Sequence, residues 1–181
     1  MKIIHTSIDG CILIEPAVHT DKRGSFSETF NQQALEKALG RTVSFVQDNQ
    51  SVSHKNVLRG LHYQQGHFAQ AKLVRVVRGC VRDVVIDLRE NSPTFGKHLK
   101  VELSEENGLA LFIPKGFAHG FLALANQTVF QYKCDAYYHP ASERGIIYDD
   151  PDLQIDWGIA GEDLILSEKD LNLPRFKEVF P

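Results

Sequence analysis

The feature that most constrains the fold is a series of short apolar runs, which fills the middle of the chain at intervals of about ten residues. The runs are rich in Val, Leu, Ile, Phe and Tyr, which favour β-strands, and turn-forming residues separate them. They read AKLVRVVRG, VRDVVIDLR, KHLKVELS, GLALFIP, HGFLALA and TVFQYKCDAYY. Strands at this spacing are typical of an antiparallel sandwich or barrel rather than of βαβ units. The sequence therefore predicts an all-β fold.

Earlier in the chain, the sequence predicts two further strands and one short helix. The segment GCILIEPAV favours a strand that ends at Pro16, and VSFVQDNQSVS favours another. Between them, NQQALEKALG has the features of a helix. Asn31 can cap its N-terminus, Leu35 and Leu39 share one face, and Gly40 can end it.

The last part of the chain is expected to be largely irregular. The segment DWGIAGEDLILSEKDLNLPRF shows no sustained period, and we expect only a short helical turn after Ser167. No low-complexity segment, linker or internal repeat divides the sequence. We therefore expect residues 1–181 to form a single domain, and 181 residues are ample for a sizeable core.

Composition narrows the functional classes. A net charge of −3 argues against an unspecific nucleic-acid binder, which usually carries a basic excess. No apolar run is long enough for a membrane span, and the N-terminus lacks the pattern of a signal peptide. Cys11, Cys80 and Cys134 are widely spaced and form no C-x-x-C pair, so we expect reduced, structural thiols. These features predict a cytoplasmic protein with no nucleic-acid or membrane partner.

One stretch, VLRGLHYQQGHFAQAKLVRV, places charged and titratable residues where a sheet would need apolar core residues. It carries Arg59, His62, His67, Lys72 and Arg75 among apolar residues. A polar sheet face followed by a surface loop would explain this pattern. A site that removes a proton from an anionic molecule would explain it too.

The alternation of side chains along a strand sorts the residues of this stretch by face. His62 and Gln64 share one face, and Leu61 lies on the other. Arg59 has the opposite parity to His62 in a regular strand. Gly60 permits a bulge between them, so Arg59 and His62 can still face one cavity.

The same alternation applies to two later strands. His119, Phe121 and Ala123 share a face in HGFLALA. Phe130, Tyr132 and Cys134 share a face in VFQYKC.

Nine motifs in series then identify a family. They are DKRGSFSETF, FVQDNQSVS, VLRGLHYQ, AKLVRVVRG, VRDVVIDLRENSPTFGK, FIPKGFAHGF, FQYKCDAYYHPASERGI, DPDLQIDW and LSEKD. Together they resemble the dTDP-4-dehydrorhamnose 3,5-epimerases over nearly the whole chain. The resemblance implies a cupin-type jelly roll (a double-stranded β-helix) with short peripheral helices, which forms a homodimer and uses no metal or redox cofactor. It implies epimerisation of C3 and C5 in dTDP-4-dehydro-6-deoxy-D-glucose, which gives dTDP-4-dehydro-L-rhamnose in deoxysugar biosynthesis.

The resemblance also implies the catalytic residues, and their chemistry suits the reaction. A 4-ketone acidifies the hydrogens on C3 and C5, so the enzyme needs a base, an opposite-face acid and a cation near the oxyanion. His62 matches the base and Tyr132 the proton donor. Asp170 matches the carboxylate that orients the base. Lys72 matches the cation near the C4 oxygen.

Further positions match the residues that hold the substrate in the family. The arginines suit diphosphate oxygens because a guanidinium donates two parallel hydrogen bonds. The implied substrate-binding residues are Arg23, Phe26, Glu28, Gln47, Asn49, Arg59, His119, Tyr138, Glu143 and Lys169. Tyr138 matches the aromatic that stacks on thymine. The segment from Arg23 to Glu28 is implied to reach the site of the neighbouring subunit.

Structural readings remain open for several of these residues. His62 and Tyr132 can be ordinary sheet residues. Asp170 stands three positions after Ser167, which is the spacing of a helix capping box. Lys72 and Arg59 can be solvated charges at sheet edges.

Three functional alternatives also stay open. Metal-binding cupins use a His-x-His pair, but here the stretch is His62-Tyr63-Gln64, and His62 with His119 gives only two ligands. A jelly roll that only binds a nucleotide sugar would keep the arginines and Tyr138 without needing the acid–base set. An epimerase that inverts only C3 or only C5 would have the same residues.

Overall fold

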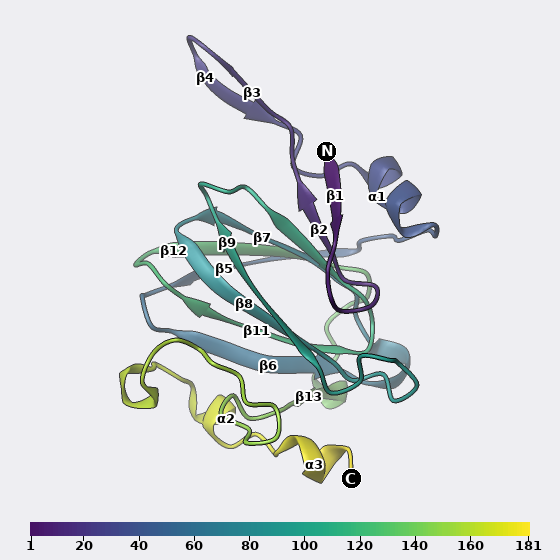
Figure 1. Ribbon diagram of the computed structural model, residues 1–181, viewed down its shortest axis with the longest axis vertical. Coiled ribbons are helices and arrows are strands. Elements are labelled where there is room, and N and C mark those ends of the chain that lie inside the picture. The colour runs from purple at the N-terminus through teal and green to yellow at the C-terminus, as the bar shows by residue number, and fades with distance from the viewer.

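The computed structural model describes residues 1–181 as two antiparallel β-sheets packed face to face, with a short hairpin and short helices around them (Figure 1). The six-stranded sheet has the order β1 (Lys2–His5), β2 (Ile12–Glu15), β10 (Ala110–Ile113), β7 (Lys72–Arg78), β12 (Thr128–Cys134) and β5 (Gln47–Ser53). The five-stranded sheet has the order β13 (Glu143–Gly145), β6 (Leu58–Gln64), β11 (Phe117–Ala123), β8 (Cys80–Asp87) and β9 (His98–Ser104). This arrangement confirms the predicted all-β jelly roll.

The helices are short and lie outside the sheets. They are α1 (Gln32–Leu39), α2 (Glu168–Leu171) and α3 (Phe176–Val179), with 3₁₀ turns at Gly66–Phe68, Pro140–Ser142 and Gly161–Asp163. None of them is long and apolar enough to cross a membrane.

Three apolar clusters hold the layers together. The largest lies between the two sheets and includes Val74, Leu111 and Phe130. A second cluster, which includes Trp157, forms where the C-terminal tail covers the outer face of the five-stranded sheet (Figure 1). The third packs Leu35 of α1 against the outer face of the six-stranded sheet. Side chains from both sheets therefore pack between the layers. Where they do not fill the space, a cavity remains between the two sheets.

The helix α1 follows the sequence prediction closely. The side chain of Asn31 accepts a hydrogen bond of 3.0 Å from the Ala34 N–H, and Gly40 ends the helix with a φ of 65°. Leu35 is buried, as the predicted apolar face requires. The expected turn after Ser167 is also present, as α2.

A hairpin of β3 (Val18–Asp21) and β4 (Gly24–Ser27) pairs only with itself. It extends away from both sheets (Figure 1). On this hairpin, Phe26 is 71% exposed and Val18 is 59% exposed. The hairpin therefore presents apolar side chains that its own chain does not cover.

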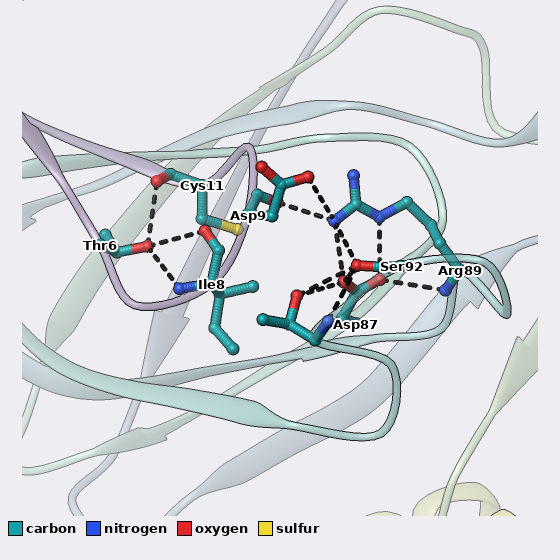
Figure 2. Close-up of polar contacts among 8 residues, drawn as sticks. Thr6, Ile8, Asp9, Cys11, Asp87, Arg89 and Ser92 are labelled. Atoms are coloured by element: carbon teal, nitrogen blue, oxygen red, sulfur yellow. Dashed lines mark hydrogen bonds and ion pairs between the residues drawn. The ribbon is translucent and has the colours of Figure 1, made fainter.

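A polar network ties the loop between β1 and β2 to the loop after β8 (Figure 2). The fully buried carboxylate of Asp87 accepts hydrogen bonds from Arg89, Ser92 and Thr94. Arg89 also donates to the backbone carbonyl of Asp9, at 2.8 Å. Burial alone would raise the pKa of Asp87, but these hydrogen bonds outweigh it and lower the pKa to about 2.

Candidate active site

A bulge in β6 creates the floor of the site. Gly60 and Leu61 of β6 lie opposite Gly120 alone in β11, because the register shifts by one residue there. Gly60 has a φ of 118°, and a Cβ at that position would lie 2.6 Å from the Gly120 Cα. Only a glycine fits this close approach of the two strands.

The bulge changes which side chains share a face. Arg59 and His62 both line one cavity between the sheets, although regular alternation would separate them. Leu61 packs on the other side, in the cluster that contains Trp157. The structure thus confirms the arrangement that the sequence allowed through Gly60.

Two adjoining cavities bring most of the predicted site residues together. The first, of about 490 Å³, is lined among others by Arg59, His62, Lys72, His119, Phe121, Phe130, Tyr132, Lys169 and Asp170. The second, of about 300 Å³, shares His62, Lys72 and Tyr132 and adds, among others, Gln47, Asn49, Gln64, Tyr138 and Glu143. The shared residues mark the point where the two cavities meet.

His62 and Asp170 form a close pair. Their atoms Nε2 and Oδ1 lie 2.6 Å apart, and the side chain of Asp170 is only 5% exposed. Burial alone would raise the pKa of Asp170, but the contact with His62, together with Ser167 and the Gly60 N–H, lowers it. The carboxylate is therefore charged at neutral pH and orients the imidazole.

Asp170 also takes part in the helix cap that its spacing from Ser167 suggested. The Asp170 N–H donates to the Ser167 hydroxyl at 3.2 Å, which is a helix cap. The carboxylate, however, is turned to His62. Capping explains the backbone of Asp170 but not the position of its side chain.

Tyr132 and Lys72 approach from the opposite wall, because β12 and β7 belong to the six-stranded sheet. Burial, with a further contribution from Cys134, raises the pKa of Tyr132, so its phenol stays protonated. The Lys72 ammonium lies 5.9 Å from the centre of the Tyr132 ring. Burial lowers the pKa of Lys72, and nearby groups such as Asp83 oppose that change.

A second histidine–carboxylate pair lies beside the first. His119 is paired with His62 across β11 and β6, and its Nε2 lies 2.9 Å from Asp83 Oδ2. Asp83 is fully buried, and its other carboxylate oxygen has no hydrogen-bond partner. Asp83 was not among the site residues predicted from the sequence. The signal was an acidic residue on the same face as the apolar residues Val81 and Val85 of a predicted strand.

Three predicted substrate residues form a hydrogen-bonded chain at the cavity mouth. The Tyr138 hydroxyl donates to Glu143 Oε2 at 2.7 Å, and Lys169 Nζ approaches the same oxygen at 2.6 Å. Burial alone would raise the pKa of Glu143, but Lys169 and Tyr138 lower it. Nearby, the Gln47 amide donates to Asn49 Oδ1 at 3.0 Å.

The remaining predicted residues do not join this site within one chain. Arg23 lies at the turn of the β3–β4 hairpin, where it pairs with Asp21. Phe26 is exposed on the same hairpin, and Glu28 accepts a hydrogen bond from Asn31 at 3.2 Å. None of the three lines the cavities around His62.

The site combines a histidine–carboxylate pair, a tyrosine and a partly buried lysine around one cavity of a jelly roll. This combination is typical of enzymes that use acid–base catalysis. Its residues suit proton transfer next to a carbonyl group, where a base, an acid and a cation act on the same carbon framework. The chain belongs to the dTDP-4-dehydrorhamnose 3,5-epimerase family, because the model of that family matches residues 5–178.

Individual relatives agree with this assignment. The dTDP-4-dehydrorhamnose 3,5-epimerase of Escherichia coli K12 is 54% identical over 179 residues, which cover 99% of this chain and 96% of that protein. The crystal structure of the corresponding epimerase from Elizabethkingia anophelis is 52% identical, with a TM-score of 0.95 over 98% of this chain and 97% of that one. The Legionella pneumophila 3,5-epimerase, solved in complex with dTDP-4-keto-L-rhamnose, is 49% identical, with a TM-score of 0.90 over 97% and 98% of the chains.

Proposed function

We propose that this chain is an isomerase that inverts C3 and C5 of dTDP-4-dehydro-6-deoxy-D-glucose and so makes dTDP-4-dehydro-L-rhamnose. The observation that carries the proposal is the arrangement of four side chains around one cavity. His62 and Asp170 form a pair on one side, while Tyr132 and Lys72 come from the opposite sheet. Family membership supports the choice of substrate.

The first step is removal of a proton from the carbon next to the ketone. His62 Nε2 faces Asp170, so Nε2–H donates to the carboxylate and Nδ1 is left as the base. The C–H electron pair forms a double bond to C4, and the carbonyl π pair moves to the C4 oxygen, which gives an enolate. The imidazole takes the proton and becomes an imidazolium that Asp170 stabilises. The Lys72 ammonium stabilises the charge on the enolate oxygen.

The second step returns a proton to the other face of the ring. Tyr132 stays protonated because burial raises its pKa. Its phenol gives a proton to the same carbon from the opposite wall, the enolate collapses to the ketone, and the configuration is inverted. Proton exchange with water resets both side chains. The same sequence at the second α-carbon completes the reaction.

The nucleotide is held at the mouth of the cavity. We assign the diphosphate to Arg59 and Lys169, since both cations line the cavity that holds the base. Tyr138 is half-exposed beside the second cavity, which suits stacking on thymine. Gln47, Asn49, His119 and Glu143 line the two cavities and complete the substrate contacts.

Arg23, Phe26 and Glu28 act on the neighbouring subunit of a homodimer. Their hairpin pairs only with itself and exposes most of Phe26, so its own chain offers these side chains no substrate cavity. A second copy that receives the hairpin would cover this apolar surface and complete its own site.

We further propose that the reaction uses no cofactor and that residues 1–181 form one domain. We also propose that the protein acts in the cytoplasm. His62, Asp170, Tyr132 and Lys72 together supply the base, its partner carboxylate, the acid and the cation, so the proposed steps need no metal or redox cofactor. The cysteines are all free, which suits a compartment that keeps thiols reduced.

Removal of the base tests the assignment. The variant His62→Ala should lose turnover by a factor of about 10² to 10⁴, the usual contribution of a general base. It should still bind dTDP, because the nucleotide contacts remain. Near-normal turnover in His62→Ala would contradict the assignment of the base.

A mixed dimer tests the shared site. Heterodimers of a His62→Ala subunit and a Phe26→Ala subunit, purified through two different tags, contain one intact site if the hairpin reaches the neighbour. They should then show about half of the wild-type rate, as one of two symmetric sites is complete. No recovery above either parent homodimer would mean that the hairpin does not serve its neighbour.

A further inference from the structure

The loop that carries Tyr138 has almost no backbone support of its own. Residues 136–139 follow the end of β12, and their only backbone–backbone hydrogen bond runs from Ser142 N–H to the His139 carbonyl. A loop of this kind would normally move, which would blur the position of the ring that we assign to thymine.

Side-chain amides replace the missing backbone bonds. Gln70 Nε2 donates to the Ala136 carbonyl at 2.7 Å. The Tyr138 N–H donates to Gln47 Oε1 at 2.9 Å. Each glutamine therefore fixes one backbone group of the loop, Gln47 from the start of β5 and Gln70 from the segment just before β7.

Gln64 makes the most extensive of these contacts. Its Nε2 donates to the Tyr137 carbonyl at 3.3 Å, and its Oε1 accepts from the His139 N–H at 2.7 Å. One amide thus forms hydrogen bonds with the backbone on both sides of Tyr138. Gln64 is only 6% exposed, so loss of the amide would leave these groups without a partner.

The same amide joins a second loop to the first. Gln64 Nε2 also donates to the Phe68 carbonyl at 2.6 Å. The Phe68 ring stacks on His139, with centroids 3.7 Å apart and planes inclined by 6°. Gln64 therefore couples both loops at the cavity mouth to β6, two residues after the base His62.

We propose that Gln64 is a positioning residue for nucleoside recognition: its buried amide fixes the loop of Tyr138 and thereby sets the affinity for the thymidine diphosphate half of the substrate. The inference rests on the proposed nucleotide-sugar substrate. Gln64 acts through Tyr138, so its effect should depend on the Tyr138 ring and should fall on binding rather than on proton transfer.

A double-mutant cycle tests this role, with dTDP binding measured by calorimetry. Gln64→Met keeps the length of the side chain but removes every hydrogen bond. It should raise the Kd for dTDP at least tenfold and change kcat at saturating substrate by less than about threefold. In a Tyr138→Ala background, the same substitution should change Kd by less than about twofold. The matched control is Gln32→Met, which removes an exposed glutamine on α1 and should leave Kd unchanged.

The outcomes separate this inference from the proposed function. An unchanged Kd in folded Gln64→Met, or an equal loss in both backgrounds, would overturn the positioning role while leaving the epimerase assignment intact. A wild-type protein that does not bind dTDP would overturn both. If Gln64→Met does not fold, Gln70→Met decides, because it loses a single bond to the same loop. It should then raise Kd about threefold only when Tyr138 is present, and an unchanged Kd would overturn the role.

Discussion

At the residue scale, Asp170 serves two neighbours, one through its backbone and one through its side chain. Its N–H completes a helix cap on Ser167, and its carboxylate lies 2.6 Å from His62. The sequence spacing predicted the cap as readily as the pair. Only the three-dimensional position of β6 shows that the carboxylate points into the cavity.

The variant Asp170→Asn separates these two roles. The amide keeps the size and the cap but removes the charge that stabilises the imidazolium, so kcat should fall by about 10² to 10⁴. The folded state also lowers the pKa of Asp170, so the melting temperature should fall somewhat, while kcat falls by orders of magnitude. Steady-state kinetics and thermal unfolding measure the two effects. Ser167→Ala provides the comparison, since loss of a cap should lower the free energy of unfolding by about 1 kcal/mol. A purely structural Asp170 would make both variants behave alike.

At the element scale, the bulge in β6 decides whether the site forms at all. Gly60 and Gly120 let two strands approach so closely that Arg59 and His62 turn to the same side. A side chain at position 60 would meet backbone atoms of β11 and would also force an unfavourable φ.

The variant Gly60→Ala should therefore lower the free energy of unfolding by about 3 kcal/mol or more, from backbone strain and overpacking together. Urea unfolding followed by the fluorescence of Trp157, the single tryptophan, measures this change. Gly40→Ala is the control, because its φ is 65° but no atom lies within 4 Å of the added Cβ. It should cost only about 1 to 2 kcal/mol. Equal losses in both variants would contradict the close strand approach.

Local signals made part of this architecture predictable. Asn31 and Gly40 marked the ends of α1, and alternation grouped Tyr132 with Phe130 on one face of β12, because these features depend on neighbours in sequence. The structure shows that this face lines the cavity. The bulge depends on Gly120 in another strand. The pair of His119 with Asp83 likewise joins two strands, so the sequence alone did not indicate it.

At the scale of the whole molecule, the network around Asp87 joins loops that are far apart in sequence (Figure 2). The folded state lowers the pKa of Asp87 from 3.8 to about 2. A carboxylate with a depressed pKa stabilises the fold above its unfolded pKa, and this stabilisation is lost as pH falls from about 4 towards 2.

The variant Asp87→Asn should remove the contribution of this carboxylate to the pH dependence of the free energy of unfolding. The variant should be less stable than the wild type at pH 6, and the gap should narrow as pH falls through this window. Urea unfolding at a series of pH values measures the gap. A gap that stays constant from pH 6 to pH 2 would show that the Asp87 charge does not stabilise the fold.

The sequence reached its limit at the hairpin. Its residues match substrate contacts of the family, yet one chain leaves them outside the cavity, with Phe26 exposed. The residue pattern of this hairpin does not by itself specify contacts with another copy, which only the family resemblance implied. The homodimer therefore stays a prediction, which the mixed-dimer experiment addresses.

In the proposed reaction, this cavity moves protons at two carbons beside a ketone. The most direct measurement is proton NMR in D2O, with the purified protein, a chelator and dTDP-4-dehydro-6-deoxy-D-glucose. We expect deuterium at both C3 and C5, with conversion to the L-configured sugar. Deuterium at only one carbon would indicate an epimerase of a single centre. No exchange in a protein that binds dTDP would contradict the claim and leave a jelly roll that only binds the nucleotide sugar.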